Sequence, residues 1–261
     1  MPSRAPVAQT ASSRFRVIAV LLLAATVAAC EVSVKRDERP AERPAESSAP
    51  YQAEVEEGLG AAVAILIDTS GSMKERAPGD SRQKHVVARE AIEAMLDATD
   101  AFLARRSDFP IKIGVYSFSS GVRTLRSIEP YERESVRAAL ARLPGPGGGT
   151  AIGDAMREAR PDLYRAGVFR KYLVVVTDGE NTNGRSPENV AREIFTKSQG
   201  GVQVYFVAFD TSPEKFGFLK DAGGDVIGAN TGAELKTALD GIYQGRILAE
   251  AVTGAEAPIK K

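Results

Sequence analysis

The chain has very little of the chemistry on which many enzymes and metal sites depend. Its 261 residues include one His, one Cys and no Trp. A single histidine leaves Ser–His–Asp triads and histidine zinc sites with little to build from. A single cysteine excludes an internal disulfide. The sequence therefore argues against triad hydrolases and against small domains held together by zinc or disulfides.

The chain also lacks an excess of charge of either sign. Its 34 Lys and Arg are matched by 34 Asp and Glu, so the formal net charge is +0. Proteins that bind nucleic acid through its phosphates usually carry a basic surface. We therefore expect no nucleic-acid partner. A hydrophobic content of 43% is ordinary for a globular protein with a substantial core.

The first thirty residues have the layout of a secretory signal. Three arginines precede an apolar run at 17–27, and two alanines then lead to Cys30. Eleven apolar residues are too few to cross a hydrocarbon core, which takes roughly 20 in a helix. We expect residues 1–29 to be a signal peptide rather than a permanent transmembrane helix.

Residues 27–30 resemble the bacterial lipobox, in which the bond before the cysteine is cut and its sulfur is lipidated. Cys30 is the only cysteine and lies at the required end of the apolar run. The resemblance implies a cell-envelope protein that is attached to a membrane through Cys30. Ordinary signal cleavage after Ala29 is the alternative. Glu31 is not the Asp that marks inner-membrane retention in many enteric bacteria, so the choice between the outer membrane and the periplasmic face stays open.

The remainder divides by composition into three parts. Residues 30–57 are rich in Glu, Arg, Pro, Ala and Ser and are expected to form a disordered tether behind the lipidated cysteine. Residues 58–249 contain the apolar segments of a folded domain. Residues 250–261 show no periodicity and are expected to be an unstructured tail.

Within the domain, strand-like and helix-like patterns alternate. Alternation of this kind predicts an α/β fold with a mainly parallel, doubly wound, Rossmann-like sheet and helices on both faces. One antiparallel edge strand is expected at 122–128, after a short turn. The expected central strands are 61–67, 111–118, 172–177 and 202–209, and the expected helices are 86–103, 132–142, 152–166, 187–197 and 233–248.

Polar side chains follow two of these strands. Asp68, Ser70 and Ser72 come directly after the first strand, and Asp178 follows the strand at 172–177. Thr150 ends a glycine-rich loop that opens a helix. In an open α/β sheet the ligand crevice lies beyond the carboxyl ends of the strands. The sequence therefore predicts that these oxygen-bearing side chains meet at one edge of the sheet.

This set of five residues resembles the metal-ion-dependent adhesion site of von Willebrand factor A and integrin inserted domains. The resemblance implies that Ser70, Ser72 and Thr150 approach a divalent ion through their hydroxyls, and that Asp68 and Asp178 contribute directly or through water. Hard cations prefer oxygen ligands, so Mg²⁺ is expected, with Mn²⁺ or Ca²⁺ as alternatives. A partner protein would supply an Asp or Glu carboxylate to complete the ion's shell.

The function predicted from the sequence is therefore a non-enzymatic, metal-dependent protein-binding or adhesion module tethered to the cell envelope. One alternative is a phosphoesterase or phosphotransferase that uses the same ion as a Lewis acid. An Asp-x-Asp phosphotransferase pattern is missing, because position 70 is Ser. The other alternative is a structural envelope lipoprotein whose site has no metal-bridged ligand.

Overall fold

The computed structural model describes residues 57–249. The predicted signal peptide, Cys30, the tether up to residue 56 and the tail at 250–261 lie outside the described residues. Within 57–249, no helix combines the length and the apolar character that crossing a membrane requires.

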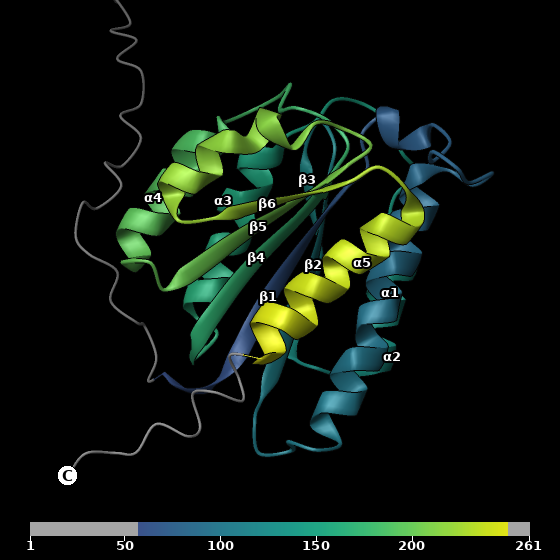
Figure 1. The fold of residues 1–261 in the computed structure, drawn as a ribbon. Helices are drawn as coiled ribbons and strands as arrows, with labels where there is room; N and C mark the ends of the chain where they lie inside the picture. Colours follow the sequence, from purple (N-terminus) through teal and green to yellow (C-terminus); the bar gives the residue numbers. More distant parts are fainter. Residues whose placement is uncertain (1–56, 250–261) are drawn as a thin grey trace, which may run out of the picture. The chain divides into compact units, whose positions relative to one another are not determined.

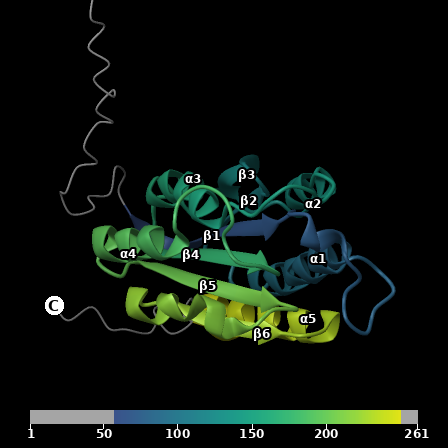
Figure 2. The ribbon, with the colours of Figure 1, turned by 90° about the horizontal axis from the view of Figure 1, so that it is seen from above.

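A six-stranded sheet runs through the centre of the domain in the order β3-β2-β1-β4-β5-β6 (Figure 1). β3 pairs antiparallel with β2 at one edge, and the other neighbouring pairs are parallel. Figure 2 shows the arrows of β1, β4 and β5 pointing the same way. The predicted fold class is therefore confirmed. The strands are β1 (Gly58–Asp68), β2 (Ile111–Phe118), β3 (Val122–Pro130), β4 (Val168–Thr177), β5 (Val202–Phe209) and β6 (Asp225–Ala229).

The uninterrupted apolar run of β1 is explained by its central place in the sheet. Every residue from Gly60 to Asp68 is buried, because helices cover both faces. Val63, Ile65 and Ile67 face one hydrophobic core. The alternating alanines and Leu66 face the other core. A strand covered on both sides has no polar face and so shows no alternation.

Two groups of helices form the outer layers (Figure 1). One core contains side chains of α1, α2 and α5, and the other contains side chains of α3, α4 and a 3₁₀ segment. The helices are α1 (Lys84–Leu103), α2 (Arg133–Ala141), α3 (Ile152–Tyr164), α4 (Pro187–Ser198) and α5 (Gly232–Ile242), and the 3₁₀ segment η2 spans Pro213–Ala222.

Two parts of the C-terminal region differ from the sequence prediction. β6 was not expected, because it has only five residues, contains an Asp and a Gly, and is mostly half-buried at the sheet edge. The helix expected at 233–248 is α5 followed by a π-helical segment, η3 (Tyr243–Leu248). Periodicity of apolar residues does not distinguish these two helix types over so short a stretch.

The direction in which successive strands are added changes between β1 and β4. The chain leaves β1 through α1 on one face and moves toward β2, whereas it leaves β4 through α4 on the other face and moves toward β5. Strand order thus reverses between β1 and β4. Ligands in open α/β sheets bind at such a point, beyond the carboxyl ends of the strands.

Candidate functional site

Asp68, the last residue of β1, has a completely buried side chain whose two oxygens are both hydrogen-bonded. The backbone N–H of Ser70 donates to Oδ1 at 2.7 Å. The hydroxyl of Thr177, at the end of β4, donates to Oδ2 at 2.6 Å. These bonds fix the carboxylate at the switch point, between the two strands whose ends meet there.

The turn after β1 carries two serines toward Asp178. The Oγ atoms of Ser70 and Ser72 lie 3.1 Å apart. Ser72 donates from its Oγ to Oδ1 of Asp178 at 2.7 Å. The end of β1 and the residue after β4 are thus joined by a continuous row of oxygen atoms. Ser72 also begins a short 3₁₀ helix, η1 (Ser72–Lys74), that leads the chain away from the site.

The glycine-rich loop brings Thr150 to the same edge through backbone bonds. The N–H of Gly147 donates to the carbonyl of Thr69 at 2.9 Å, and the N–H of Gly71 donates to the carbonyl of Gly148 at 3.0 Å. Gly148 has a φ of 79°, a conformation that glycine adopts without steric cost. All three predicted segments therefore meet at one edge of the sheet.

The loop after Asp178 holds Thr150 in place. Thr150 donates its N–H to Oγ1 of Thr182 at 2.8 Å. The N–H groups of Thr182 and Asn183 both donate to the carbonyl of Thr150. Within residues 57–249, no hydrogen bond joins the Thr150 hydroxyl to the other four predicted ligands, so this residue is positioned by its backbone.

The arrangement fits a small, hard divalent ion. Adjacent ligands of an octahedral Mg²⁺, at about 2.0–2.1 Å from the ion, lie about 3 Å apart, close to the 3.1 Å between the Oγ atoms of Ser70 and Ser72. No cluster of three or more His, Cys, Asp or Glu suited to a metal occurs in the described part of the chain. The donors at this edge are instead hydroxyls supported by two carboxylates.

Burial makes Asp68 hard to ionise without a cation. Loss of solvent raises the pKa of Asp68 to about 6, although hydrogen bonds from Thr177 and Ser70 partly oppose the shift. The nearby carboxylate of Asp178 makes a smaller contribution to the same rise in the pKa of Asp68. A divalent ion would offset this repulsion, which is a second reason why these residues suit a metal.

Three charged residues outside the predicted ligand set also lie at the site, namely Lys84, Asp210 and Glu75. Lys84, the first residue of α1, is buried and places its Nζ 3.1 Å from Oδ2 of Asp178. Its Nζ also lies 2.8 Å from Oδ2 of Asp210 and 3.3 Å from Oε2 of Glu75. Burial opposes the charged form of Lys84, but hydrogen bonds to Asp210 and Asp178 outweigh it, and its pKa lies above its ordinary value.

Asp154 lies in the first turn of α3, four residues after Thr150. In the structure its Oδ1 accepts a 3.3 Å hydrogen bond from the N–H of Arg185. The carboxylate also lies against Gly184, where an added Cβ would meet Oδ2 of Asp154 at 1.9 Å. Asp154 therefore orders the loop beyond Asn183 and supports Thr150 only indirectly.

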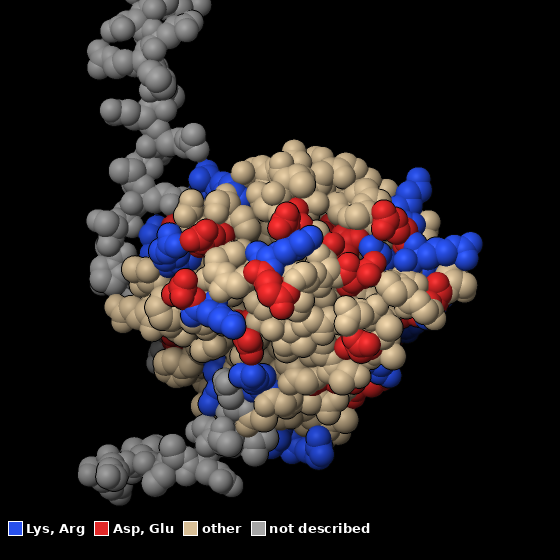
Figure 3. Space-filling view, turned by 45° about the horizontal axis from the view of Figure 1, so that its top comes forward, with Lys and Arg blue, Asp and Glu red and all other residues tan. Residues whose placement is uncertain are grey.

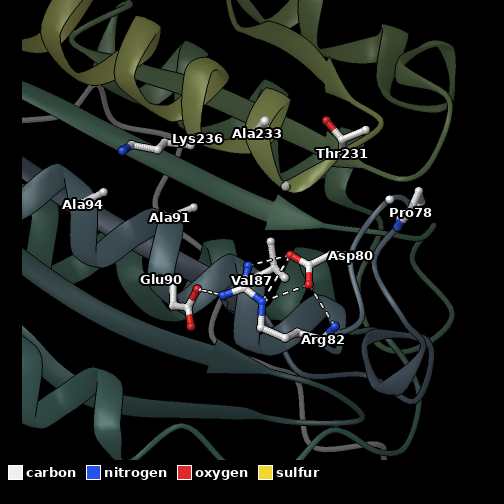
Figure 4. A pocket seen from close by; sticks show the side chains of 12 residues that line it. Pro78, Asp80, Arg82, Val87, Glu90, Ala91, Ala94, Thr231, Ala233 and Lys236 are labelled. Carbon is white, nitrogen blue, oxygen red and sulfur yellow. Dashed lines mark hydrogen bonds and ion pairs between the residues drawn. The ribbon is translucent and has the colours of Figure 1, made fainter.

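A hollow of about 670 Å³, lined by none of the five predicted ligands, lies between α1, the start of α5 and the loop before α1 (Figure 4). Arg82 in its wall is already paired with Asp80, at 2.5 Å, and with Glu90. Figure 3 shows acidic and basic side chains interspersed on the visible face, without a large area of one sign. The residues suited to bind a metal thus remain those at the strand ends.

The described domain is similar to known proteins. The model of the von Willebrand factor type A domain family matches residues 62–226. The uncharacterized protein YwmC of Bacillus subtilis is 26% identical over 168 residues, which cover 62% of this chain and 72% of YwmC.

Solved structures of the same fold come from distant proteins. The PilB minor pilin of Streptococcus sanguinis superposes with a TM-score of 0.61 at 16% identity, over 77% of this chain and 64% of the pilin. Proximal thread matrix protein 1 of the mussel byssus, solved with a zinc-occupied adhesion motif, superposes with a TM-score of 0.58 at 20% identity, over 74% of this chain and 49% of that protein. Since the family model matches more than half of its length, this chain belongs to the von Willebrand factor type A domain family.

Proposed function

We propose that this domain is a non-enzymatic, metal-dependent protein-binding module. Asp68, Ser70, Ser72, Thr150 and Asp178 would hold one divalent ion, and a carboxylate from a partner protein would complete its shell. The observation that carries the proposal is the row of Ser70, Ser72 and Asp178 oxygens at 3.1 and 2.7 Å, with the buried Asp68 behind it.

The chemistry of the ligand set supports binding rather than turnover. Three neutral hydroxyls and two carboxylates place two negative charges around a divalent ion. Because the ligand charge does not exceed that of the ion, the ion can still bind a further anionic ligand. Thr177 and the N–H of Ser70 hold Asp68 in one orientation, and Ser72 does the same for Asp178. These bonds pre-organise the site, which reduces the cost of ordering when an ion and a partner bind.

Mg²⁺ is the proposed physiological ion, with Mn²⁺ and Ca²⁺ as alternatives that share its preference for oxygen. The zinc in the motif of the mussel protein shows that a related domain accepts a transition metal, so Zn²⁺ belongs in the same titration. Isothermal titration calorimetry of the purified chain with each ion would rank them. Asp68→Ala should abolish binding, whereas Asp221→Ala, at an exposed aspartate of η2, should not change it.

The partner is tested by retrieval from an envelope extract. The wild-type chain should retain a protein in Mg²⁺ and release it in EDTA, and the Ser70→Ala/Ser72→Ala variant should retain none. The same partners in Mg²⁺ and EDTA would instead indicate a structural lipoprotein without a metal-bridged ligand. Turnover of phosphate esters that is lost in Asp178→Ala would replace the binding role with an enzymatic one.

The proposed setting is the cell envelope, with the domain attached through a lipid on Cys30 and separated from the membrane by residues 31–57. The motif at 27–30 and the absence of another cysteine support this proposal. Metabolic labelling with a radioactive fatty acid should mark the wild-type chain and not Cys30→Ser. Membrane fractionation of the same two proteins would show whether the lipid is what retains the chain.

A further inference from the structure

Lys84 occupies a position that is electrostatically poor for a lysine. It is the first residue of α1, where the helix dipole is positive and disfavours a cation. Its side chain is only 5% exposed, so water does little to solvate the ammonium. No acidic residue lies in the first turn of α1 to compensate. Stabilisation must therefore come from outside the helix.

Three carboxylates from three different segments supply that stabilisation. An ammonium has three N–H donors. Here the acceptors within reach are Asp210 at 2.8 Å, Asp178 at 3.1 Å and Glu75 at 3.3 Å. Asp178 is a proposed metal ligand, whereas Asp210 follows β5 and Glu75 follows η1. Lys84 thus connects the metal-binding edge to two carboxylates that are not part of the ligand set.

The backbone of Asp210 indicates that this connection is built at some cost. Its φ is 53°, in the left-handed region that residues with a Cβ rarely adopt. The N–H of Asp210 donates to the carbonyl of Ala229 at 2.8 Å, which holds the conformation in place. Strained residues persist where surrounding structure determines them, and they cluster at functional sites. The strain here places a carboxylate against the Lys84 ammonium.

Both carboxylate oxygens of Asp178 are already engaged by side chains of the protein. Its Oδ1 accepts from Ser72 and its Oδ2 accepts from Lys84. An arriving divalent ion must share this carboxylate with the ammonium of Lys84, whose side chain is almost completely buried. Like charges at short range repel strongly where water is excluded. The same ammonium also neutralises much of the Asp178 charge that would otherwise attract the ion.

From this geometry we infer that Lys84 is an internal counter-ion of the metal site that lowers its affinity for the divalent ion. Asp210 and Glu75 are the acceptors that keep the ammonium in place whether or not the ion is bound. The inference rests on the proposed metal-binding function. It implies that the domain alone holds its ion weakly, and that a partner carboxylate supplies the negative charge that Lys84 cancels. Metal and partner would then strengthen each other's binding, as reciprocal linkage requires.

The test is the affinity of the purified chain for Mg²⁺ and Mn²⁺, measured by isothermal titration calorimetry without any partner. Lys84→Met keeps the length and apolar stem of the side chain and removes its charge. Its dissociation constant should fall about tenfold or more, since each 1.4 kcal/mol is a factor of ten. Lys236→Met, at an exposed lysine of α5, makes the same change in net charge and should leave the affinity unchanged. Lys84→Arg retains the charge and should show no such gain.

An unchanged or weaker affinity in Lys84→Met would overturn the inference, because Lys84 would then merely position Asp178. If Lys84→Met does not fold, as judged by circular dichroism, Lys84→Gln provides a second neutral side chain with the same expected gain. Failure of both neutral variants to fold would make Lys84 a structural residue and would also overturn the inference. If no variant and no wild-type chain binds either ion, the proposed metal site itself is wrong. If the wild type and the Lys84 variants bind the ions with equal affinity, the metal site stands and only the inferred role of Lys84 is wrong.

Discussion

Thr177 donates a 2.6 Å hydrogen bond from its Oγ1 to Oδ2 of Asp68, joining the ends of β4 and β1 inside the protein. The bond favours the charged carboxylate, yet burial outweighs it and raises the pKa of Asp68 to about 6 from 3.8. A proposed metal ligand is therefore held in a place where its charge is unfavourable without a cation. The free energy of unfolding should reveal this conflict through its dependence on pH.

Asp68→Asn should remove a pH-dependent loss of stability. In the wild-type chain with EDTA, the folded state holds the Asp68 proton more tightly than the unfolded state between about pH 4 and 6. This group's stabilisation is fully present below pH 4 and is lost as the pH rises through about 6, by up to about 3 kcal/mol. The asparagine variant cannot ionise, so its unfolding free energy relative to wild type should rise over this range.

Urea unfolding at pH 4.5, 5.5 and 7 in EDTA measures that difference. Asp221→Asn is the matched control, because it makes the same change in charge at an exposed aspartate of η2. Adding Mg²⁺ at pH 7 should stabilise the wild type and leave Asp68→Asn unchanged. A gap between Asp68→Asn and wild type that stays the same at all three pH values would contradict the raised pKa.

The same glycine-to-alanine change should have opposite effects in two helices. A Cβ on Gly153, in the first turn of α3, would lie 2.2 Å from the carbonyl oxygen of Arg185, a backbone atom that cannot move freely. Overpacking of this kind costs about 1–3 kcal/mol. Nothing lies within 4 Å of a Cβ on Gly241 in α5, so alanine there should stabilise the helix by about 1 kcal/mol.

Chemical denaturation of Gly153→Ala and Gly241→Ala checks both signs. Gly153→Ala should also weaken Mg²⁺ binding, because it pushes the loop that holds Thr150 away from the start of α3. Gly241→Ala should leave the affinity for Mg²⁺ unchanged. Equal effects of the two substitutions on stability would mean that the contact with Arg185 relaxes easily.

The part of the site that lies at the ends of parallel strands was predictable from the sequence. Parallel strands bring their carboxyl ends to one edge, so Asp68 and Asp178 were predictable once two buried strands were recognised. The same rule places Asp210 at this edge, because it directly follows β5. Lys84 gave no such signal, because in the sequence it is one charged residue at the start of a helix. Only the folded loop between η1 and α1 turns its side chain inward.

The fold was predictable where segments are long and buried, and less so at the sheet edge. β1 and β5 show continuous apolar runs because both faces are covered. β6 has five residues, most of them half-buried. It forms a strand because it pairs with β5, not because its own hydrophobic pattern predicts one. Local sequence carries little information about a strand that exists mainly because a neighbour offers hydrogen bonds.

Gln199 and Asp210 are the two non-glycine residues with positive φ among residues 57–249, and they should respond differently to glycine. Gln199 ends α4 with a φ of 52° and an exposed side chain. Gln199→Gly should stabilise the domain by roughly 0.5–1 kcal/mol, because glycine adopts this helix-ending conformation without steric cost. Asp210→Gly relieves similar strain but deprives the buried Lys84 of its nearest carboxylate, so it should destabilise. Thermal unfolding of both variants in EDTA tests the contrast, and a gain in both would show that the ion pair contributes little.

The buried pair Thr99 and Tyr243 should lose stability unequally when either partner is removed. Their hydroxyl oxygens lie 2.6 Å apart, and both side chains are completely buried. Thr99 donates its single hydroxyl proton to the carbonyl of Met95, at 3.1 Å, so Tyr243 must be the donor to Thr99. Tyr243→Phe removes that donor and leaves Thr99 with its other bond, at a cost of about 1 kcal/mol.

Thr99→Val instead leaves the Tyr243 hydroxyl buried without an acceptor, which should cost about 2–3 kcal/mol. The double variant Thr99→Val/Tyr243→Phe removes the stranded hydroxyl and should therefore be more stable than Thr99→Val alone. Urea unfolding of the two single variants and the double variant measures this cycle. If Tyr243→Phe destabilises the domain more than Thr99→Val does, the direction of the hydrogen bond is reversed. Thr99 would then donate its hydroxyl proton to Tyr243 rather than to the carbonyl of Met95.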